Sequence, residues 1–362
     1  MPGLFDPITV GDLHLRNRIM RSATWESLAD VETGAPLPEL KELYRALGEG
    51  GVGLIVTGHT WIEPSGRAHA RMCSLAEDEL IPIWREVIRP AQEAGARVMV
   101  QINHGGANVD PTVTPNPVSP SGIATNDLVT PRALADDEIL HIVEAFGQAA
   151  RRAREAGFDG VQIHGGHAFL VTQFLSPMTN RRDDRWGGDA ERRRSFLKAI
   201  VGEMRRQVGQ DYPLWIKLGV AGKGESGLSI KDGAQVAAAC GEYAVECIEV
   251  SHGLGIPESM DTRGEGRYLP LAQQVRRAVG PDYPLALVYG LRSRRVMEEV
   301  LDSGVVQIIS LCRPLIAEPD LPNKLREGIV DQAACDRCDR CGPLEPGEGI
   351  ACRNERVLES LR

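Results

Sequence analysis

Short runs rich in β-branched residues alternate with longer amphipathic segments along most of the chain. The amphipathic periodicity predicts helices, for example over Asp136–Ala156 and Asp189–Val208, and several helical segments stop at a glycine such as Gly157 or Gly209. Eight alternating strand and helix units predict an α/β fold of the (β/α)8 TIM-barrel type. The eight predicted strands are Arg18–Thr24, Val52–Gly58, Arg97–Asn103, Gly160–Gly165, Leu214–Gly219, Cys247–His252, Leu285–Gly290 and Val305–Leu311.

The alternative α/β architecture, a doubly wound sheet, normally places a glycine fingerprint directly after its first strand. The chain has one GxGxxG match, at Gly48, Gly50 and Gly53, but it precedes a strand, so we interpret it as a helix stop. We therefore expect a barrel domain over residues 1–328 and a cysteine-bearing tail over residues 329–362 that packs on the barrel.

Composition and charge narrow the function classes. The chain has 362 residues, 42% of them hydrophobic, and a formal net charge of −9, which fits a globular enzyme and argues against nonspecific nucleic-acid binding. No segment reaches the roughly 18 apolar residues that span a bilayer, and the first ten residues lack the features of a signal peptide. We expect a cytoplasmic enzyme with a small-molecule substrate, no membrane or nucleic-acid partner, and a homo-oligomeric state.

Polar residues gather at the ends of the predicted strands, where barrels place their catalytic groups. Gln101 and Lys217 suit a flat heterocycle that becomes an anion on reduction, because one offers an amide edge and the other a positive charge. Gly290 and Arg313 match the phosphate site that barrels form near their last strands. A heterocycle that carries a phosphate points to FMN, and composition alone leaves a sugar phosphate open.

The segment HGGH places His164 and His167 three residues apart where the fourth predicted strand ends. This spacing could serve zinc, but the residues leave a strand and enter a loop, so helical geometry is not expected. A histidine pair that holds an anionic oxygen is the better interpretation, because both rings can donate N–H groups.

At these residues the chain resembles the old yellow enzyme family of NADH:flavin oxidoreductases. The resemblance rests on LFDPITVGDLHLRNRIMRSAT near the start, QINHGG at 101–106, the block at 164–196 and RPLIAEPDLPNK at 313–324. It implies a TIM barrel with non-covalent FMN, hydride chemistry at flavin N5, and a pair, His164 and His167, that binds the carbonyl oxygen of an activated alkene. The flavin-binding positions that it implies are Ala23, Thr24, Gly58, Gln101, Lys217, Gly290 and Arg313.

The tail carries a cysteine motif, CxxCxxC followed by a fourth cysteine after ten intervening residues. It is similar to the tails of 2,4-dienoyl-CoA reductase and trimethylamine dehydrogenase, which implies a [4Fe–4S] cluster, although both later gaps are one residue shorter here. Structural zinc stays open, because four cysteines also fit tetrahedral Zn²⁺. Electrons would come from NAD(P)H or from a redox partner protein. The ligands would be Cys335, Cys338, Cys341 and Cys352.

Three positions depart from the family pattern. Phe169 stands where the family has a proton-donating tyrosine, and Trp25 and Cys312 replace smaller residues beside the flavin. His252, after the sixth predicted strand, is the substitute acid that we expect from the sequence. The leading hypothesis is reduction of an activated C=C bond by an FMN enzyme. The alternatives are oxidation or N-demethylation of an amine, and a non-catalytic flavin or iron–sulfur electron carrier.

Overall fold

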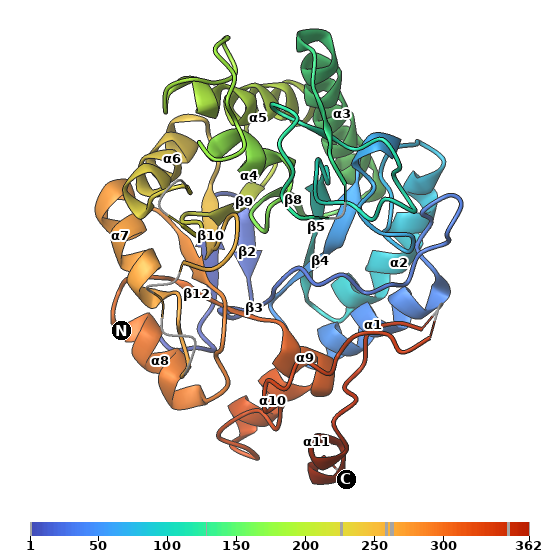
Figure 1. The fold of residues 1–362 in the computed structure, drawn as a ribbon. Coiled ribbons are helices and arrows are strands. Elements are labelled where there is room, and N and C mark those ends of the chain that lie inside the picture. Colours follow the sequence, from blue (N-terminus) through green and yellow to red (C-terminus); the bar gives the residue numbers. More distant parts are fainter. Residues whose placement is uncertain are drawn as a thin grey trace.

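The computed structural model describes residues 2–127, 129–224, 227–257, 260, 264–345 and 348–361. Its centre is a closed barrel of eight parallel strands in which each strand pairs with its neighbours in chain order and the last pairs with the first (Figure 1). The predicted α/β barrel is therefore confirmed. The barrel strands are β3 (Ile19–Arg21), β4 (Leu54–Trp61), β5 (Arg97–Asn103), β8 (Gly160–Gly165), β9 (Leu214–Gly219), β10 (Cys247–Ser251), β11 (Leu285–Leu287) and β12 (Ile308–Leu311).

Helices surround the barrel, and all except the C-terminal helix at Glu355–Ser360 contribute buried apolar residues to its core (Figure 1). The predicted helix at Asp136–Ala156 has these bounds, with acidic residues in its first turn and Gly157 in the left-handed region at φ 89°. The helices are α1 (Pro38–Glu49), α2 (Leu80–Glu93), α3 (Asp136–Ala156), α4 (Leu170–Leu175), α5 (Ser195–Val208), α6 (Ile230–Glu242), α7 (Leu269–Val279), α8 (Arg294–Asp302), α9 (Arg313–Ala317), α10 (Leu321–Glu327) and α11 (Glu355–Ser360).

Some predicted bounds were wrong. The helix predicted to begin at Asp189 begins as α5 at Ser195, because the Asp189 carboxylate accepts the Arg192 N–H and the chain first forms a turn and a short 3-10 helix at Arg192–Arg194. The strand predicted to end at Gly290 ends at Leu287, where the backbone turns into the left-handed region at Tyr289 and Gly290. Strand β4 runs three residues past its predicted end, to Trp61.

A short antiparallel hairpin closes one end of the barrel. It consists of β1 (Ile8–Val10) and β2 (Leu13–Leu15), which the sequence did not predict. Val10, Leu13 and Leu15 pack in one buried cluster with inward side chains of seven barrel strands, among them Trp215. The opposite end, where the strands finish, is therefore the open end, and it carries the candidate site.

The segment after α10 packs along this open end. Gln332 forms an isolated antiparallel bridge with Ser293, and the Ala333 N–H donates to the Arg292 carbonyl at 3.0 Å. The loop after β5 adds a two-stranded pair, β6 (Val118–Ser119) and β7 (Arg132–Ala133). Among the described residues, no helix is long and apolar enough to cross a membrane.

Candidate active site

A buried carboxylate organises the inside of the barrel below its open end. The Glu249 carboxylate is fully buried and accepts hydrogen bonds from the Ser22 and Ser310 hydroxyls, both at 2.7 Å. The Lys217 Nζ lies 3.4 Å from the same carboxylate and donates to Ser22 Oγ at 2.7 Å. Gln162 bonds Glu249 at 3.1 Å. Because a buried charge is tolerated only when it is paired and hydrogen-bonded, this network fixes Lys217 at the barrel mouth.

Gln101 belongs to the same network. Its Nε2 donates to Gln162 Oε1 at 2.7 Å, so its carbonyl oxygen and its second N–H are left for other partners. The network therefore joins the two polar residues that the sequence assigned to a heterocycle, Gln101 and Lys217, through side chains on four neighbouring strands. The sequence analysis missed Gln162 and Glu249.

Above the network lies a cavity of about 290 Å³, called here the Arg313 cavity. Lys217, Gly290 and Arg313 line it, as expected for the heterocycle and phosphate positions. Tyr289 also lines it, in a strained conformation at φ 93°, a condition that tends to occur at functional sites. Its ring stacks on Tyr268 with centroids 4.6 Å apart.

Positive charge is concentrated around the Arg313 cavity. The Arg267 guanidinium lies 4.9 Å from the Tyr289 ring centroid, and the Arg337 guanidinium donates to the Gly264 carbonyl. Burial and the charges of neighbouring arginines, Arg313 among them, lower the pKa of Arg337. Guanidinium groups at this density match an anionic group with several oxygens, such as a phosphate.

A second cavity of about 260 Å³ adjoins the first and shares Ala23 and His167 with it. It is called here the Phe169 cavity, because Phe169 occupies its wall. Four of its lining residues are histidines. The full lining is Ala23, Trp25, His59, His69, Gln101, Asn108, His164, His167 and Phe169.

The predicted histidine pair lies at this cavity in a neutral state. The rings of His164 and His167 meet edge to face with centroids 5.0 Å apart. Burial lowers the pKa of both imidazoles well below the usual value, and neighbouring positive groups such as Lys217 add to this. The Gly166 N–H donates to His164 Nδ1 at 3.2 Å, which leaves the proton of that neutral ring on Nε2.

His167 is held differently from its partner. Its Nε2 lies 2.9 Å from the Ser251 hydroxyl, and its backbone is left-handed at φ 53°, followed by Ala168 at φ 64°. The two strained residues are fixed by N–H bonds from His167 and Ala168 to the carbonyls of His252 and Gly253. The loop after β10 thus sets the position of His167.

Two of the predicted flavin positions line neither cavity. The Gly58 N–H donates to both oxygens of the buried Glu26 carboxylate, at 3.0 and 3.1 Å, and a Cβ at Gly58 would lie 2.1 Å from that carboxylate. The Thr24 hydroxyl donates to the Ser22 carbonyl at 2.9 Å and contacts Cys312. These contacts are structural, and a flavin role for either residue stays a prediction. Of the other predicted barrel residues, each lines at least one cavity: Ala23, Gln101, His164, His167, Lys217, His252, Gly290 and Arg313.

His252 lines the Arg313 cavity and not the Phe169 cavity. Its ring lies 4.6 Å from the His167 ring, and its Nδ1 lies 3.3 Å from the Gly253 carbonyl. His167 therefore stands between His252 and the cavity that holds Phe169. The predicted acid role of His252 stays a prediction.

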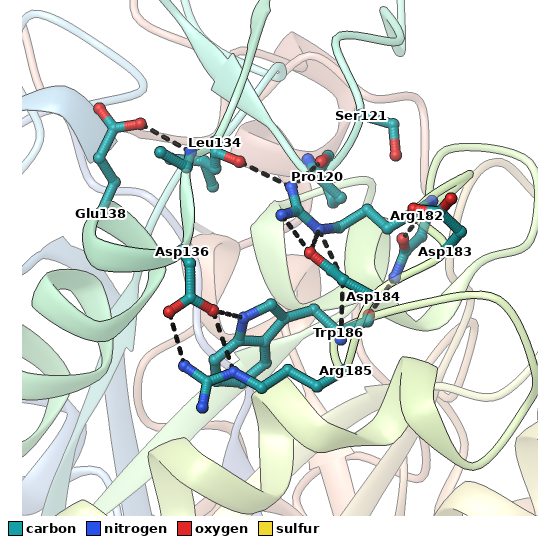
Figure 2. A network of polar contacts seen from close by, with 12 residues as sticks. Pro120, Ser121, Leu134, Asp136, Glu138, Arg182, Asp183, Asp184, Arg185 and Trp186 are labelled. Carbon is teal, nitrogen blue, oxygen red and sulfur yellow. Dashed lines mark hydrogen bonds and ion pairs between the residues drawn. The ribbon is translucent and has the colours of Figure 1, made fainter.

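Much of the family-like block at 164–196 serves to fix loops. Figure 2 shows the Arg182 guanidinium between the Pro120 and Leu134 carbonyls, at 2.7 and 2.6 Å, and the Asp184 carboxylate. The Trp186 indole N–H donates to Asp136 at the start of α3 at 2.6 Å, beside Arg185. These bonds tie the loop after β8 to the loop after β5, and both loops border the Phe169 cavity.

The tail cysteines lie near one another and near the barrel. Burial and the neighbouring thiols of Cys335, Cys312, Cys352 and Cys338 raise the pKa of Cys341 to about 11. Among the described residues, however, no three His, Cys, Asp or Glu side chains are arranged to hold a metal ion. The metal centre stays a prediction.

The tail also reaches the Arg313 cavity. The Asp339 carboxylate forms an ion pair with Arg313, and the Arg337 carbonyl accepts from the same guanidinium at 3.2 Å. Residues between the first and third tail cysteines therefore touch the predicted phosphate site.

The donors at the barrel mouth fit FMN. The cluster of guanidinium groups beside Gly290 suits its phosphate, and the Gln101 amide and the Lys217 ammonium suit the polar edge of its ring.

Comparison with known proteins agrees with this arrangement. The family described as the NADH:flavin oxidoreductase / NADH oxidase family matches residues 3–332. The chain is 34% identical to an NADH oxidase of Thermoanaerobacter brockii over an alignment of 371 positions, which covers 100% of this chain and 55% of the relative. It is 32% identical to an NADPH dehydrogenase of Geobacillus thermodenitrificans, covering 88% of this chain and 92% of the relative.

Among solved structures, a complex of 2-naphthoyl-CoA reductase with 2-naphthoyl-CoA superimposes with a TM-score of 0.89 at 25% identity. The match covers 99% of this chain and 57% of the 2-naphthoyl-CoA reductase chain. This chain therefore spans little more than half the length of that reductase and of the Thermoanaerobacter relative.

Proposed function

This chain belongs to the NADH:flavin oxidoreductase / NADH oxidase family, and on that premise we propose that it reduces a C=C bond activated by a carbonyl group. The family implies FMN and a reduced nicotinamide as hydride source. Bound FMN would supply the site that takes a hydride from NAD(P)H and delivers it to the β carbon of the substrate. The substrate would occupy the Phe169 cavity.

The observation that carries the proposal is the chemistry of that cavity. Its described lining residues include four histidines, an asparagine and a glutamine, and no Asp or Glu is among them. A carbonyl oxygen that gains negative charge as the reaction proceeds needs N–H donors, which these residues offer. A cationic amine needs a carboxylate or a larger aromatic surface, and apart from its histidines the lining offers only two aromatic side chains, Trp25 and Phe169.

The chain's own residues would act as follows. Arg313 and Gly290 hold the phosphate, while Lys217 and Gln101 hold the polar edge of the ring. His164, neutral and with its proton on Nε2, donates to the substrate oxygen. His167 would bind the same oxygen. Because removing one donor of this kind costs about 10²–10³ in kcat, His164→Ala should lose activity by that factor.

Amine oxidation is the second candidate. Phe169 favours it, because removal of a hydride from an amine needs no acid at the position where the family has tyrosine. A non-catalytic electron carrier is the third, and it predicts a bound flavin that neither an alkene nor an amine oxidises or reduces.

An anaerobic stopped-flow experiment separates the three. The flavin is reduced with NADH or NADPH and then mixed with cyclohexenone, while the oxidised protein is mixed with trimethylamine. Reoxidation by the enone supports alkene reduction, and a Phe169→Tyr variant should reoxidise faster, because it restores an acid. Bleaching by trimethylamine with no reaction toward enones overturns the proposal in favour of amine oxidation. Inertness toward both leaves the electron-carrier function.

A further inference from the structure

Five of the eight histidines form a continuous row across the barrel mouth. The row runs from His69 through His59 to His164, with ring centroids 5.5 and 6.0 Å apart, and continues through His167 to His252 at 5.0 and 4.6 Å. Its first two members belong to β4 and the loop after it. Neither was expected at the site from the sequence.

His59 borders the place where the family's acid would stand. Its ring centroid is 5.0 Å from that of Phe169, and the His164 ring lies 4.8 Å from Phe169 on another side. The Asn103 amide donates to His59 Nδ1 at 3.1 Å, which leaves the proton of the neutral ring on Nε2. His59 lines the Phe169 cavity, so this ring can reach a substrate bound there.

His59 is largely shielded from bulk water, because only 7% of the residue is exposed. Burial, with smaller contributions from His69 and Lys217, lowers its pKa to about 3. After giving up a proton, it would therefore need a neighbour to return one. The ring of His69 is the candidate for that role.

His69 connects this cavity to solvent. It is half-buried, lines the same cavity, and packs against Trp25 with centroids 4.6 Å apart. Its environment combines burial, which lowers its pKa, with the nearby Asp110 carboxylate, which raises it. The 5.5 Å between the His59 and His69 centroids is a separation that one bridging water or a ring rotation spans.

We propose that His59 delivers the proton that completes alkene reduction and that His69 returns a proton from solvent to His59. His59 would thus replace the family's tyrosine, whose position Phe169 occupies. The inference rests on the proposed function. After the hydride has reached the β carbon, the electron pair of the enolate forms a C–H bond at the α carbon while the Nε2–H bond of His59 breaks, which leaves this neutral ring as an imidazolate. The imidazolate then takes a proton from His69, and His69 takes one from water, so that the negative charge of the enolate ends as hydroxide. His59 is thus a catalytic residue and His69 a positioned proton carrier.

The sequence predicts a different proton donor, His252. His252 lies at the Arg313 cavity, beyond His167, whereas His59 and His69 lie at the cavity of Phe169. Variants at the two places therefore decide between the two acids.

The test uses the full chain loaded with FMN and the variants His59→Asn, His69→Gln and His252→Asn, with His141→Asn on the exposed surface of α3 as the control. Flavin is reduced with NAD(P)H, and its reoxidation is followed with cyclohexenone and, separately, with ferricyanide, which takes electrons without a carbon–proton bond. Loss of the acid should slow enone reoxidation about 10²–10⁴-fold in His59→Asn. Ferricyanide reoxidation should match the parent, which excludes a folding or flavin-binding defect.

Two further readouts separate proton delivery from packing. The solvent deuterium isotope effect on enone reoxidation should grow in His69→Gln, where reloading becomes slow. Phe169→Tyr in the His59→Asn background should restore the rate, because a phenol then donates at the same place.

The outcomes distinguish a failure of the proposed alkene reduction from a failure of the proton role of His59. A parent protein whose reduced flavin no enone reoxidises overturns the proposed function and this inference with it. If an enone reoxidises the parent flavin and His59→Asn reacts at the same rate, the inference alone is overturned. If His252→Asn is slow toward the enone while His59→Asn keeps the parent rate, the proton comes from His252.

Discussion

Replacing Glu249 with glutamine should strongly destabilise the barrel, because it leaves Lys217 as a buried and uncompensated cation. The carboxylate is fully buried, its Oε1 is 3.4 Å from Lys217 Nζ, and Ser22 and Ser310 donate to it at 2.7 Å. Removing one partner of a buried ion pair costs about 3–5 kcal/mol. The free energy of unfolding should fall by that amount in Glu249→Gln.

The assay is urea unfolding of protein stripped of flavin, so that a change in flavin affinity does not add to the stability difference. With a slope of about 3 kcal/mol per molar urea, the loss corresponds to a midpoint lowered by roughly 1–1.7 M. The double variant Glu249→Gln with Lys217→Met removes both charges and should recover at least about 1 kcal/mol relative to the sum of the single changes.

Two results would refute this reasoning. A loss under about 1 kcal/mol in Glu249→Gln would show that Lys217 is not held as a cation by that carboxylate. Strict additivity in the double variant would show that the two side chains do not interact.

Three further predictions follow from other parts of the molecule. Arg313→Ala should weaken FMN binding by about 1.5–3 kcal/mol in a fluorescence titration, while Asp339→Asn, which removes the carboxylate paired with that guanidinium, should tighten it; equal affinities would exclude Arg313 from the phosphate site. Cys338→Ala should lose the tail metal, measured as iron and sulfide or as zinc, and an unchanged metal content contradicts the assignment. Burial raises the pKa of Glu246 to about 7, although Arg205 opposes the shift, so the folded state binds the carboxyl proton more tightly than the unfolded state does. The free energy of unfolding should therefore fall as the pH rises from about 4.5 to 7. Glu246→Gln should flatten the pH dependence of stability in this range, and an unaltered slope would refute the role of Glu246.

The sequence revealed the fold because seven of the eight barrel strands are short apolar runs that follow an amphipathic helix, as Gly160–Gly165 follows Asp136–Ala156. It did not reveal the hairpin at 8–15, because three-residue strands carry too little periodicity to distinguish them from a loop. The bounds near Tyr289 were wrong because a left-handed residue other than glycine leaves no sequence signal.

The candidate site was predicted in part for a related reason. The sequence pattern predicts that the second barrel strand ends at Gly58, whereas β4 continues to Trp61 through a bulge between Val56 and His59. His59 was therefore overlooked by a single position. Glu249 did carry a signal: a carboxylate inside an apolar strand is rarely there without a partner.

The pairing that closes the barrel has a consequence for the chain during its synthesis. Ile19 of β3 pairs with Ile309 of β12, a separation of 290 residues in the chain, and the apolar hairpin of residues 8–15 finds its place only inside the completed ring. At a translation rate of about 5–20 residues per second, roughly 15–60 s pass between the appearance of the two strands. Throughout that interval the growing chain carries an unpaired strand edge and a bare apolar hairpin, which are the features that chaperones recognise and that aggregation exploits. A slowed ribosome lengthens this exposure in direct proportion, and with it the time in which the incomplete barrel can aggregate.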